Sequence, residues 1–268
     1  MIPRTILAAA ALWLGAAATA PAQTLAARIA AAPDGDVRLM YSSRPDVWGN
    51  GRNVIQWNCR GRNCRQQVDG NLSDLDDDDW HATCDTGPVR LTLRVRGGRV
   101  TALHAVVGGA WRPRSDATDL GRVPAAEAAR YLIALARQSG GDVGDHAVFA
   151  ATLADSVTTW PDLLRLARDP DVPGGTRRSA VFWVSQAAEA AATRGLDSLA
   201  GDGGVDREVR EQAVFALSQR PKDEGVPALI RIATTHADPE IRRRAIFWLG
   251  QSNDPRALEL FENLLTRP

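Results

Sequence analysis

The chain has 268 residues, of which 44% are hydrophobic, and its 32 Lys and Arg residues balance its 32 Asp and Glu residues. This composition supports one large or two ordinary folded domains, and it excludes a disordered chain, a collagen, a multi-span membrane protein and a disulfide-dense miniprotein. Zero formal net charge argues against general affinity for nucleic acid, which requires a clear excess of basic residues.

The first 22 residues are typical of a secretory signal peptide. Arg4 supplies a positive n-region, residues 6–18 form an uninterrupted apolar run, and small residues up to Ala22 favour cleavage before Gln23. The apolar run is shorter than the roughly 20 residues that a membrane-spanning helix needs, so an uncleaved anchor is the weaker alternative. We therefore expect a periplasmic or secreted protein with no membrane span after cleavage.

Three cysteines, Cys59, Cys64 and Cys84, follow in the chain. In an oxidising compartment one disulfide and one remaining thiol are expected, and the sequence does not choose among the three pairings. The same cysteines with His81 have the ligand types of a zinc site, but their spacing of four, sixteen and two intervening residues matches no common structural zinc pattern. The prediction is a disulfide and no metal.

Residues 23–122 have a β-like pattern, with alternating apolar and polar residues at 37–41, 89–95 and 100–106. The last two runs flank Gly97-Gly98, which predicts a β-hairpin because both glycines can adopt positive φ. We expect a small antiparallel β module that contains the disulfide.

Residues 123–268 change to a helical period and contain an internal repeat. A motif of Ala, Val or Ile, Phe, and Ala or Trp recurs at spacings of 33, 33 and 32 residues; it begins at Ala147, Ala180, Ala213 and Ala245. A period of this length marks a solenoid of stacked helical hairpins. The prediction is about four hairpins and a partial unit, which makes the chain α+β: a β module followed by an α-solenoid.

Parts of this repeat resemble HEAT repeats. Residues 209–214 and 241–246 are similar to the second helix of that family, residues 237–242 to its junction between helices, and residues 249–257 to its inter-repeat turn. The resemblance covers roughly residues 124–268. It implies a HEAT-like α-solenoid, a fold used mainly to hold proteins together, whose second helices line a concave surface.

The helix junctions have their own polar pattern. Asp206 and Asp238 each precede a second helix, where a carboxylate can cap the first turn. Arg210 and Arg242 follow these aspartates by four residues, so we expect Asp–Arg contacts across each junction.

The second position after each repeat alanine carries the functional hypothesis. At about 100° per residue this position lies nearly opposite the apolar face of the helix. It holds four of the five phenylalanines, Phe149, Phe182, Phe215 and Phe247. The sixth position after the alanine holds Gln186, Gln219 and Gln251, and the second position before it holds Arg178, Glu211 and Arg243.

Stacked repeats would align these side chains into a Phe ladder flanked by a Gln ladder and a charged ladder. An exposed apolar stripe with a polar rim marks an interaction surface. Alternatively, the phenylalanines pack on neighbouring repeats and complete the core. The sequence leaves both interpretations open, an exposed binding surface and packing between repeats. Trp183 and Trp248, one position further along, are expected in the core.

The sequence contains no motif that indicates catalytic chemistry. The chain has no nucleophile elbow, zinc-peptidase, Walker or dinucleotide-binding motif, and its four histidines are scattered. The acidic run Asp76–Asp79 has calcium-binding groups but lacks the glycine and glutamate of an EF-hand loop, so a solvated acidic loop is preferred.

The sequence therefore predicts a non-enzymatic scaffold or adaptor in the cell envelope, without cofactor or metal, that binds a protein or peptide along the Phe-lined face. The alternative is a cell-envelope enzyme or ligand sensor with its site in the β module or at the junction between module and solenoid. A third reading is a calcium-dependent binding module that uses the acidic loop.

Overall fold

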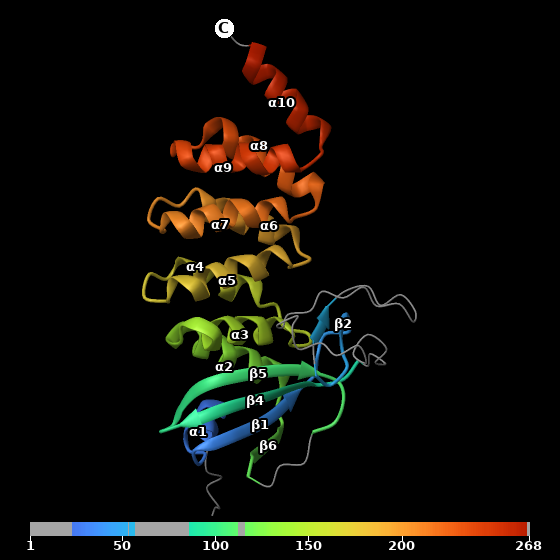
Figure 1. Ribbon diagram of the computed structural model, residues 1–268, viewed down its shortest axis with the longest axis vertical. Coiled ribbons are helices and arrows are strands. Elements are labelled where there is room, and N and C mark those ends of the chain that lie inside the picture. Colours follow the sequence, from blue (N-terminus) through green and yellow to red (C-terminus); the bar gives the residue numbers. More distant parts are fainter. Residues whose placement is uncertain (1–22, 53, 57–85, 112–115, 267–268) are drawn as a thin grey trace, which may run out of the picture.

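The computed structural model describes residues 23–52, 54–56, 86–111 and 116–266 (Figure 1). A small β-sheet region lies at one end, and pairs of helices stack away from it to the C-terminal end. The strands are β1 (Gly35–Tyr41), β2 (Val47–Gly49), β3 (Val54–Gln56), β4 (Val89–Arg96), β5 (Arg99–Val107) and β6 (Thr118–Arg122). The helices are α1 (Leu25–Ala30), α2 (Ala125–Gln138), α3 (Gly141–Thr152), α4 (Trp160–Arg168), α5 (Gly174–Ser185), α6 (Ala190–Ala200), α7 (Arg207–Ser218), α8 (Lys222–Thr235), α9 (Pro239–Gln251) and α10 (Pro255–Thr266).

Four of the strands form one sheet in the order β5-β4-β1-β6, and β2 and β3 form a separate two-stranded ribbon. The predicted hairpin is confirmed: β4 and β5 pair antiparallel, and Gly97 and Gly98 between them have φ values of 55° and 72°. Glycine adopts positive φ readily because it has no Cβ, so the Gly-Gly pair indicates the turn of a hairpin.

The four-stranded sheet is mixed rather than purely antiparallel, because β6 pairs parallel to β1. This corrects the expectation of an antiparallel module. The alternation within a strand indicates which face is buried, but it carries no information on the direction of the neighbouring strand.

The α+β prediction is confirmed by the helices that follow the sheet. The pairs α2–α3, α4–α5, α6–α7 and α8–α9 are helical hairpins, and α10 is a further single helix. The helices that carry the repeat alanine, α3, α5, α7 and α9, pack on one another from one hairpin to the next. All four repeat alanines are fully buried, so the repeat period read from the sequence is the period of the stack.

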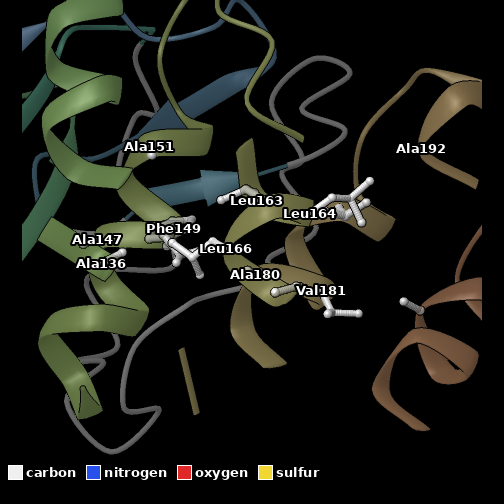
Figure 2. Packing of buried hydrophobic residues seen from close by; sticks show 14 of the residues in the cluster. Ala136, Ala147, Phe149, Ala151, Leu163, Leu164, Leu166, Ala180, Val181 and Ala192 are labelled. Atoms are coloured by element: carbon white, nitrogen blue, oxygen red, sulfur yellow. The ribbon is translucent and has the colours of Figure 1, made fainter. Parts of the chain in front are cut away.

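One hydrophobic core runs from the sheet into the helices. Its sheet end consists of apolar side chains from one face of β1 and β4, which pack with α1 and α2. Figure 2 shows the helical part, in which small alanines of α3 and α5 alternate with leucines of α4. Alternating small and large side chains let the helices approach closely and fill the space between them.

Hydrogen bonds between segments that are distant in the sequence fix the sheet to the first helical hairpin. The buried Tyr41 hydroxyl donates to the Ala150 carbonyl at 2.6 Å, and burial raises the pKa of this hydroxyl. The Arg44 amide donates to the Leu153 carbonyl, and the Asp155 amide donates to the Ser42 carbonyl, each at 2.9 Å. The end of β1 and the end of α3 are therefore held in register.

The helix junctions confirm one predicted cap and correct another. The Asp238 carboxylate accepts from the Glu240 amide at 2.9 Å, as expected for an N-cap. Asp206 makes no cap bond, because its carboxylate pairs with Arg177 of the preceding second helix.

The Asp–Arg contacts therefore run between repeats rather than across a single junction. Arg210 reaches Asp238 of the following repeat at 3.4 Å, and Arg242 donates to the His236 and Ala237 carbonyls instead of to an aspartate. The arginine side chain is long enough to bridge two stacked helices. The prediction considered only the four-residue spacing within one junction and therefore missed this contact between repeats.

Several predictions fall outside the described residues and stay predictions: the signal peptide at 1–22, the cysteines, His81 and the acidic run at 76–79. The proposed boundaries at residues 23–122 and 123–268 also stay predictions. Within the described ranges, no helix is long and apolar enough to cross a membrane.

Candidate partner-binding site

The four predicted phenylalanines belong to two aromatic clusters that repeat along the stack. The lower aromatic cluster consists of Phe149, Phe182 and Trp183, and the upper aromatic cluster consists of Phe215, Phe247 and Trp248. In each cluster a tryptophan lies between the phenylalanine of the preceding repeat and the phenylalanine of its own repeat. The position after the phenylalanine is alanine in α3 and α7 but tryptophan in α5 and α9, so the pattern has a period of two hairpins.

The ring distances are nearly the same in the two clusters, and the tilts differ. The Phe149 and Trp183 centroids are 4.9 Å apart with a tilt of 33°, and those of Phe215 and Trp248 are 4.9 Å apart with a tilt of 51°. The phenylalanine of the same helix meets each tryptophan edge to face, at 5.1 Å in the lower cluster and 5.0 Å in the upper cluster. These are favourable distances for aromatic pairs, so the tryptophans join neighbouring repeats.

Exposure differs strongly among the four phenylalanines. Phe149 is only 6% exposed, Phe182 and Phe215 are half-buried, and Phe247 is 52% exposed. Of the two alternatives that the sequence leaves open, the packed one holds at Phe149, which lies among the aliphatic side chains of α3 and α4 (Figure 2). In a stack, neighbouring helices cover the flanks of a helix as well as its apolar face. The angular position of a residue around the helix axis therefore does not by itself predict its exposure.

The predicted tryptophans are half-buried and pack against the core from this same side. Trp183 and Trp248 thus belong partly to the core, as expected, and partly to the surface of the aromatic clusters. The partner-binding role of the phenylalanines stays a prediction, because packing and partial exposure occur together.

The Gln ladder has a repeated hydrogen-bond pattern at the helix ends. Gln186 and Gln219 each donate an amide N–H to the preceding serine hydroxyl, at 2.9 and 3.0 Å. That hydroxyl, from Ser185 or Ser218, donates in turn to the carbonyl of Phe182 or Phe215 at 2.6 and 2.7 Å. Each amide is thus oriented by its own helix while its other hydrogen-bonding groups can serve a partner. Gln251 is an exposed residue at the end of α9.

The charged ladder is less regular. Arg178 and Arg243 are exposed, and Arg243 pairs with Glu240 of its own helix. Glu211 pairs with Arg244 of the next repeat at 3.0 Å. These side chains lie on the second helices as predicted, but they do not form one continuous row of a single sign.

Beside the lower aromatic cluster the structure contains a pocket of about 270 Å³, which we call the junction pocket. Trp183 and Gln186 line it, together with Trp160 and Thr159 at the start of α4. Arg44 and Asp46, an ion pair at 3.0 Å, contribute from the loop between β1 and β2. The pocket therefore lies where the sheet region meets the solenoid.

The junction pocket offers a buried hydrogen-bond donor to a ligand. The Trp160 indole nitrogen is buried and has no hydrogen-bond partner within the described part of the chain. A buried donor without a partner has a desolvation cost, which a ligand acceptor could offset. The described residues that line the pocket include no histidine, lysine or cysteine.

The residues that sequence reasoning missed are Arg44, Asp46, Thr159 and Trp160. Arg44 and Asp46 are more than a hundred residues away from Thr159 and Trp160 in the chain. Only the fixed position of the end of β1 against the end of α3 brings them together. The pair Trp160-Pro161 could have indicated a binding site in the sequence, because a large aromatic side chain is unusual in a solvated turn at the start of a helix.

No cluster of three or more His, Cys, Asp and Glu side chains that could hold a metal ion occurs among the residues described by the structure. The predicted absence of metal and cofactor stays a prediction.

The stacked antiparallel hairpins define the helical region as an α-solenoid. Residues 197–268, which extend from α6 to beyond α10, match the family model for HEAT repeats, so this part of the chain is similar to HEAT repeats. HEAT repeats commonly mediate interactions between proteins, and proteins built from them are typically not enzymes. No curated protein matches the chain.

Proposed function

We propose that this protein is a non-enzymatic adaptor of the cell envelope that binds a protein or peptide along its second helices. The observation that carries the proposal is the pair of aromatic clusters, which present partly exposed Phe182 and Phe247 at equivalent positions of the stack. Rigid aromatic side chains with a polar rim are the usual anchors of protein interfaces.

The spacing of the stack suggests the shape of the partner. Packed helices lie about 8–10 Å apart, so successive second helices present equivalent side chains at that interval. A polyproline II segment places every third residue on one face with a rise of about 9.3 Å. An extended peptide with an apolar residue at every third position therefore matches the interval between repeats, and aromatic-lined grooves are a known way to bind such segments.

The junction pocket would hold one end of this peptide. Gln186 and Trp183 connect it to the lower aromatic cluster, and the buried Trp160 N–H offers a donor for a peptide carbonyl. A peptide in this position would contact the sheet region as well as the solenoid.

The experiment is a selection from a random peptide library on the chain from residue 23 onward. Enriched peptides should carry apolar residues at every third position, and their binding should change the fluorescence of Trp183 and Trp248. The double variant Phe182→Ser/Phe247→Ser should bind them at least about tenfold more weakly, because loss of two interface anchors exceeds the roughly 1.4 kcal/mol that a tenfold change requires.

The matched control is Leu258→Ser/Leu265→Ser, which removes two side chains that are 60% and 86% exposed on α10, outside the aromatic clusters. Circular dichroism must show that both double variants are folded. Equal affinity of the wild type and the phenylalanine variant, or equal losses in the two double variants, would contradict the proposed surface.

Export is a separate part of the proposal. The residues just after the predicted cleavage site are used in the fold: Thr24 caps α1, and Leu25 and Ile29 are buried. Cleavage before Gln23 would therefore leave every residue that α1 needs. N-terminal sequencing of the protein from an envelope fraction should begin at Gln23, and a sequence that begins at Met1 would contradict export by cleavage.

A further inference from the structure

The open face of the four-stranded sheet contains a hollow of about 570 Å³ that the partner-binding site does not use. The opposite face of β1 and β4 packs into the core, so the hollow is formed by the alternate residues. Register places Arg38 beside Thr92 and Thr92 beside His104, with Asp36 and Arg94 paired in the next row. We call this the sheet pocket.

The wall of the sheet pocket is rich in positive charge. Its described lining residues include four arginines, Arg38, Arg52, Arg90 and Arg94, and one acidic residue, Asp36. Asp36 accepts from Arg94 at 2.6 Å and is almost fully buried. The guanidinium groups present planar sets of N–H donors that match the oxygens of carboxylate, phosphate or sulfate.

Trp111 completes the pocket and connects two of these arginines. The guanidinium carbon of Arg38 lies 4.9 Å from the Trp111 ring centroid, and that of Arg90 lies 5.5 Å from it. Both are cation–π distances. The Trp111 indole nitrogen is buried and has no hydrogen-bond partner within the described ranges, so a donor is available beside the guanidinium groups.

The pocket is held in shape by backbone contacts. Arg90 donates to the Gly108 and Gly109 carbonyls, at 3.0 and 2.6 Å, and so fixes the loop that carries Trp111. Gly51 donates to the Val107 carbonyl at 2.9 Å. A Cβ on Gly51 would lie 2.9 Å from the Gly109 Cα, so two glycines are required where the loops meet. The rim that carries Arg52 is thereby fastened to the end of β5.

The electrostatics of the pocket favour an anion. Burial and the positive charge of Arg122 both lower the pKa of Arg90. An anion placed beside Arg90 would offset its repulsion from Arg122 and replace part of the hydration that burial removes. The volume exceeds that of a bare inorganic ion and lies in the range of small-molecule sites.

We propose that the sheet pocket binds a small organic ligand through an oxyanion group, with the Trp111 N–H and the surrounding guanidinium groups as donors. This site is independent of the proposed peptide site, and either can fail without the other. The shared chemistry is the oxyanion, which can be a phosphate or a carboxylate.

The test is isothermal titration of the chain from residue 23 onward with phenyl phosphate, benzoate and the uncharged benzyl alcohol. Saturable binding of phenyl phosphate or benzoate, with no binding of benzyl alcohol, is expected, and the tighter of the two anions identifies the oxyanion. Binding of neither anion, or equal binding of the alcohol, would overturn the proposal.

Two variants separate a built site from general attraction of charge. Trp111→Phe keeps an aromatic ring beside the arginines but removes the N–H, and it should weaken binding about tenfold, as expected for a hydrogen bond to a charged group. Arg52→Gln should also weaken binding, whereas Arg96→Gln removes the same charge from β4 outside the pocket and should not. Thermal unfolding must show that all three variants are folded, and equal effects of Arg52→Gln and Arg96→Gln would contradict the site.

Discussion

The lower and upper aromatic clusters have the same sequence motif and nearly the same ring distances, yet they differ in exposure. Phe149 is buried in the lower cluster, whereas its equivalent Phe215 is half-buried; Phe182 is half-buried, whereas its equivalent Phe247 is mostly exposed. The difference comes from the neighbours. Strand β5 packs against α3, whereas α7 lies among helices of the stack and α9 lies near its end.

This comparison shows that one repeated motif can have two environments. Near the sheet its aromatic rings complete the core, and farther along they are more exposed. The gradient of exposure is set by what packs beside each hairpin, so function at this surface is expected to depend more on the upper cluster and stability more on the lower one.

The largest effect is expected for Phe149→Ala. Removal of this buried ring leaves a cavity and removes its contact with Trp183, so unfolding free energy should fall by about 3–5 kcal/mol. Phe247→Ala removes an exposed ring with one edge contact and should cost less than about 1.5 kcal/mol. Urea unfolding followed by circular dichroism measures both, and equal losses would show that the two clusters do not differ as their exposure implies.

An intermediate effect is expected at Arg220, which links the hairpin of the lower cluster to the next one. Its guanidinium is buried, with 5% of the residue exposed, and it donates to the Ser185, Ala187 and Glu189 carbonyls and to Thr193 and Glu224. The equivalent position in the next repeat is Ser252, whose hydroxyl bonds within its own helix.

Arg220→Met keeps the length of the side chain but leaves these buried carbonyls without their donor, so a loss of about 2–4 kcal/mol is expected. Arg256→Met is the control, because this arginine is largely exposed and pairs with Asp254 at 2.8 Å. Its loss should stay below about 1 kcal/mol, as for exposed ion pairs. A thermal or urea unfolding series distinguishes the two, and similar losses would mean that Arg220 does not join the hairpins.

The smallest effect concerns the pH dependence of the same link. The Thr193 hydroxyl and Arg220, both donating to Glu224, lower the pKa of this carboxyl below its ordinary value of 4.5. A lowered pKa means that the folded state holds the proton less tightly than the unfolded chain, so the stabilisation is complete above pH 4.5 and is lost as the pH falls through the folded value. Glu224→Gln should flatten the acid limb of stability against pH. An unchanged slope would assign the acid sensitivity to other carboxylates.

The fold was largely predictable where the signal is local. The Gly-Gly turn, the alternation in β4 and the period of the second helices each depend on neighbouring residues, and each is confirmed. The direction of β6 and the partners of Asp206 and Arg210 were not predictable, because they depend on contacts between segments that the sequence spacing does not relate.

The candidate sites show the same division. The sequence identified the phenylalanines and glutamines because they recur at a fixed interval, but it left open whether Phe149 is exposed or packed. It missed Trp160, Arg44 and the whole sheet pocket, since these combine loops and strands without any repeat. Trp111 carries no motif, and only the register of three strands brings Arg38 and Arg90 to its ring.

The sequence by itself therefore determined the two-part α+β organisation, the hairpin, the HEAT-like period and the residues that recur on the second helices. Local conformational preferences and periodic burial are written residue by residue, so a single chain reveals them. Tertiary structure alone decided which recurring side chains are covered, where the sheet meets the solenoid, and which charged residues gather in one hollow. Those properties arise from packing between distant segments, where the same Phe has a different environment in each hairpin.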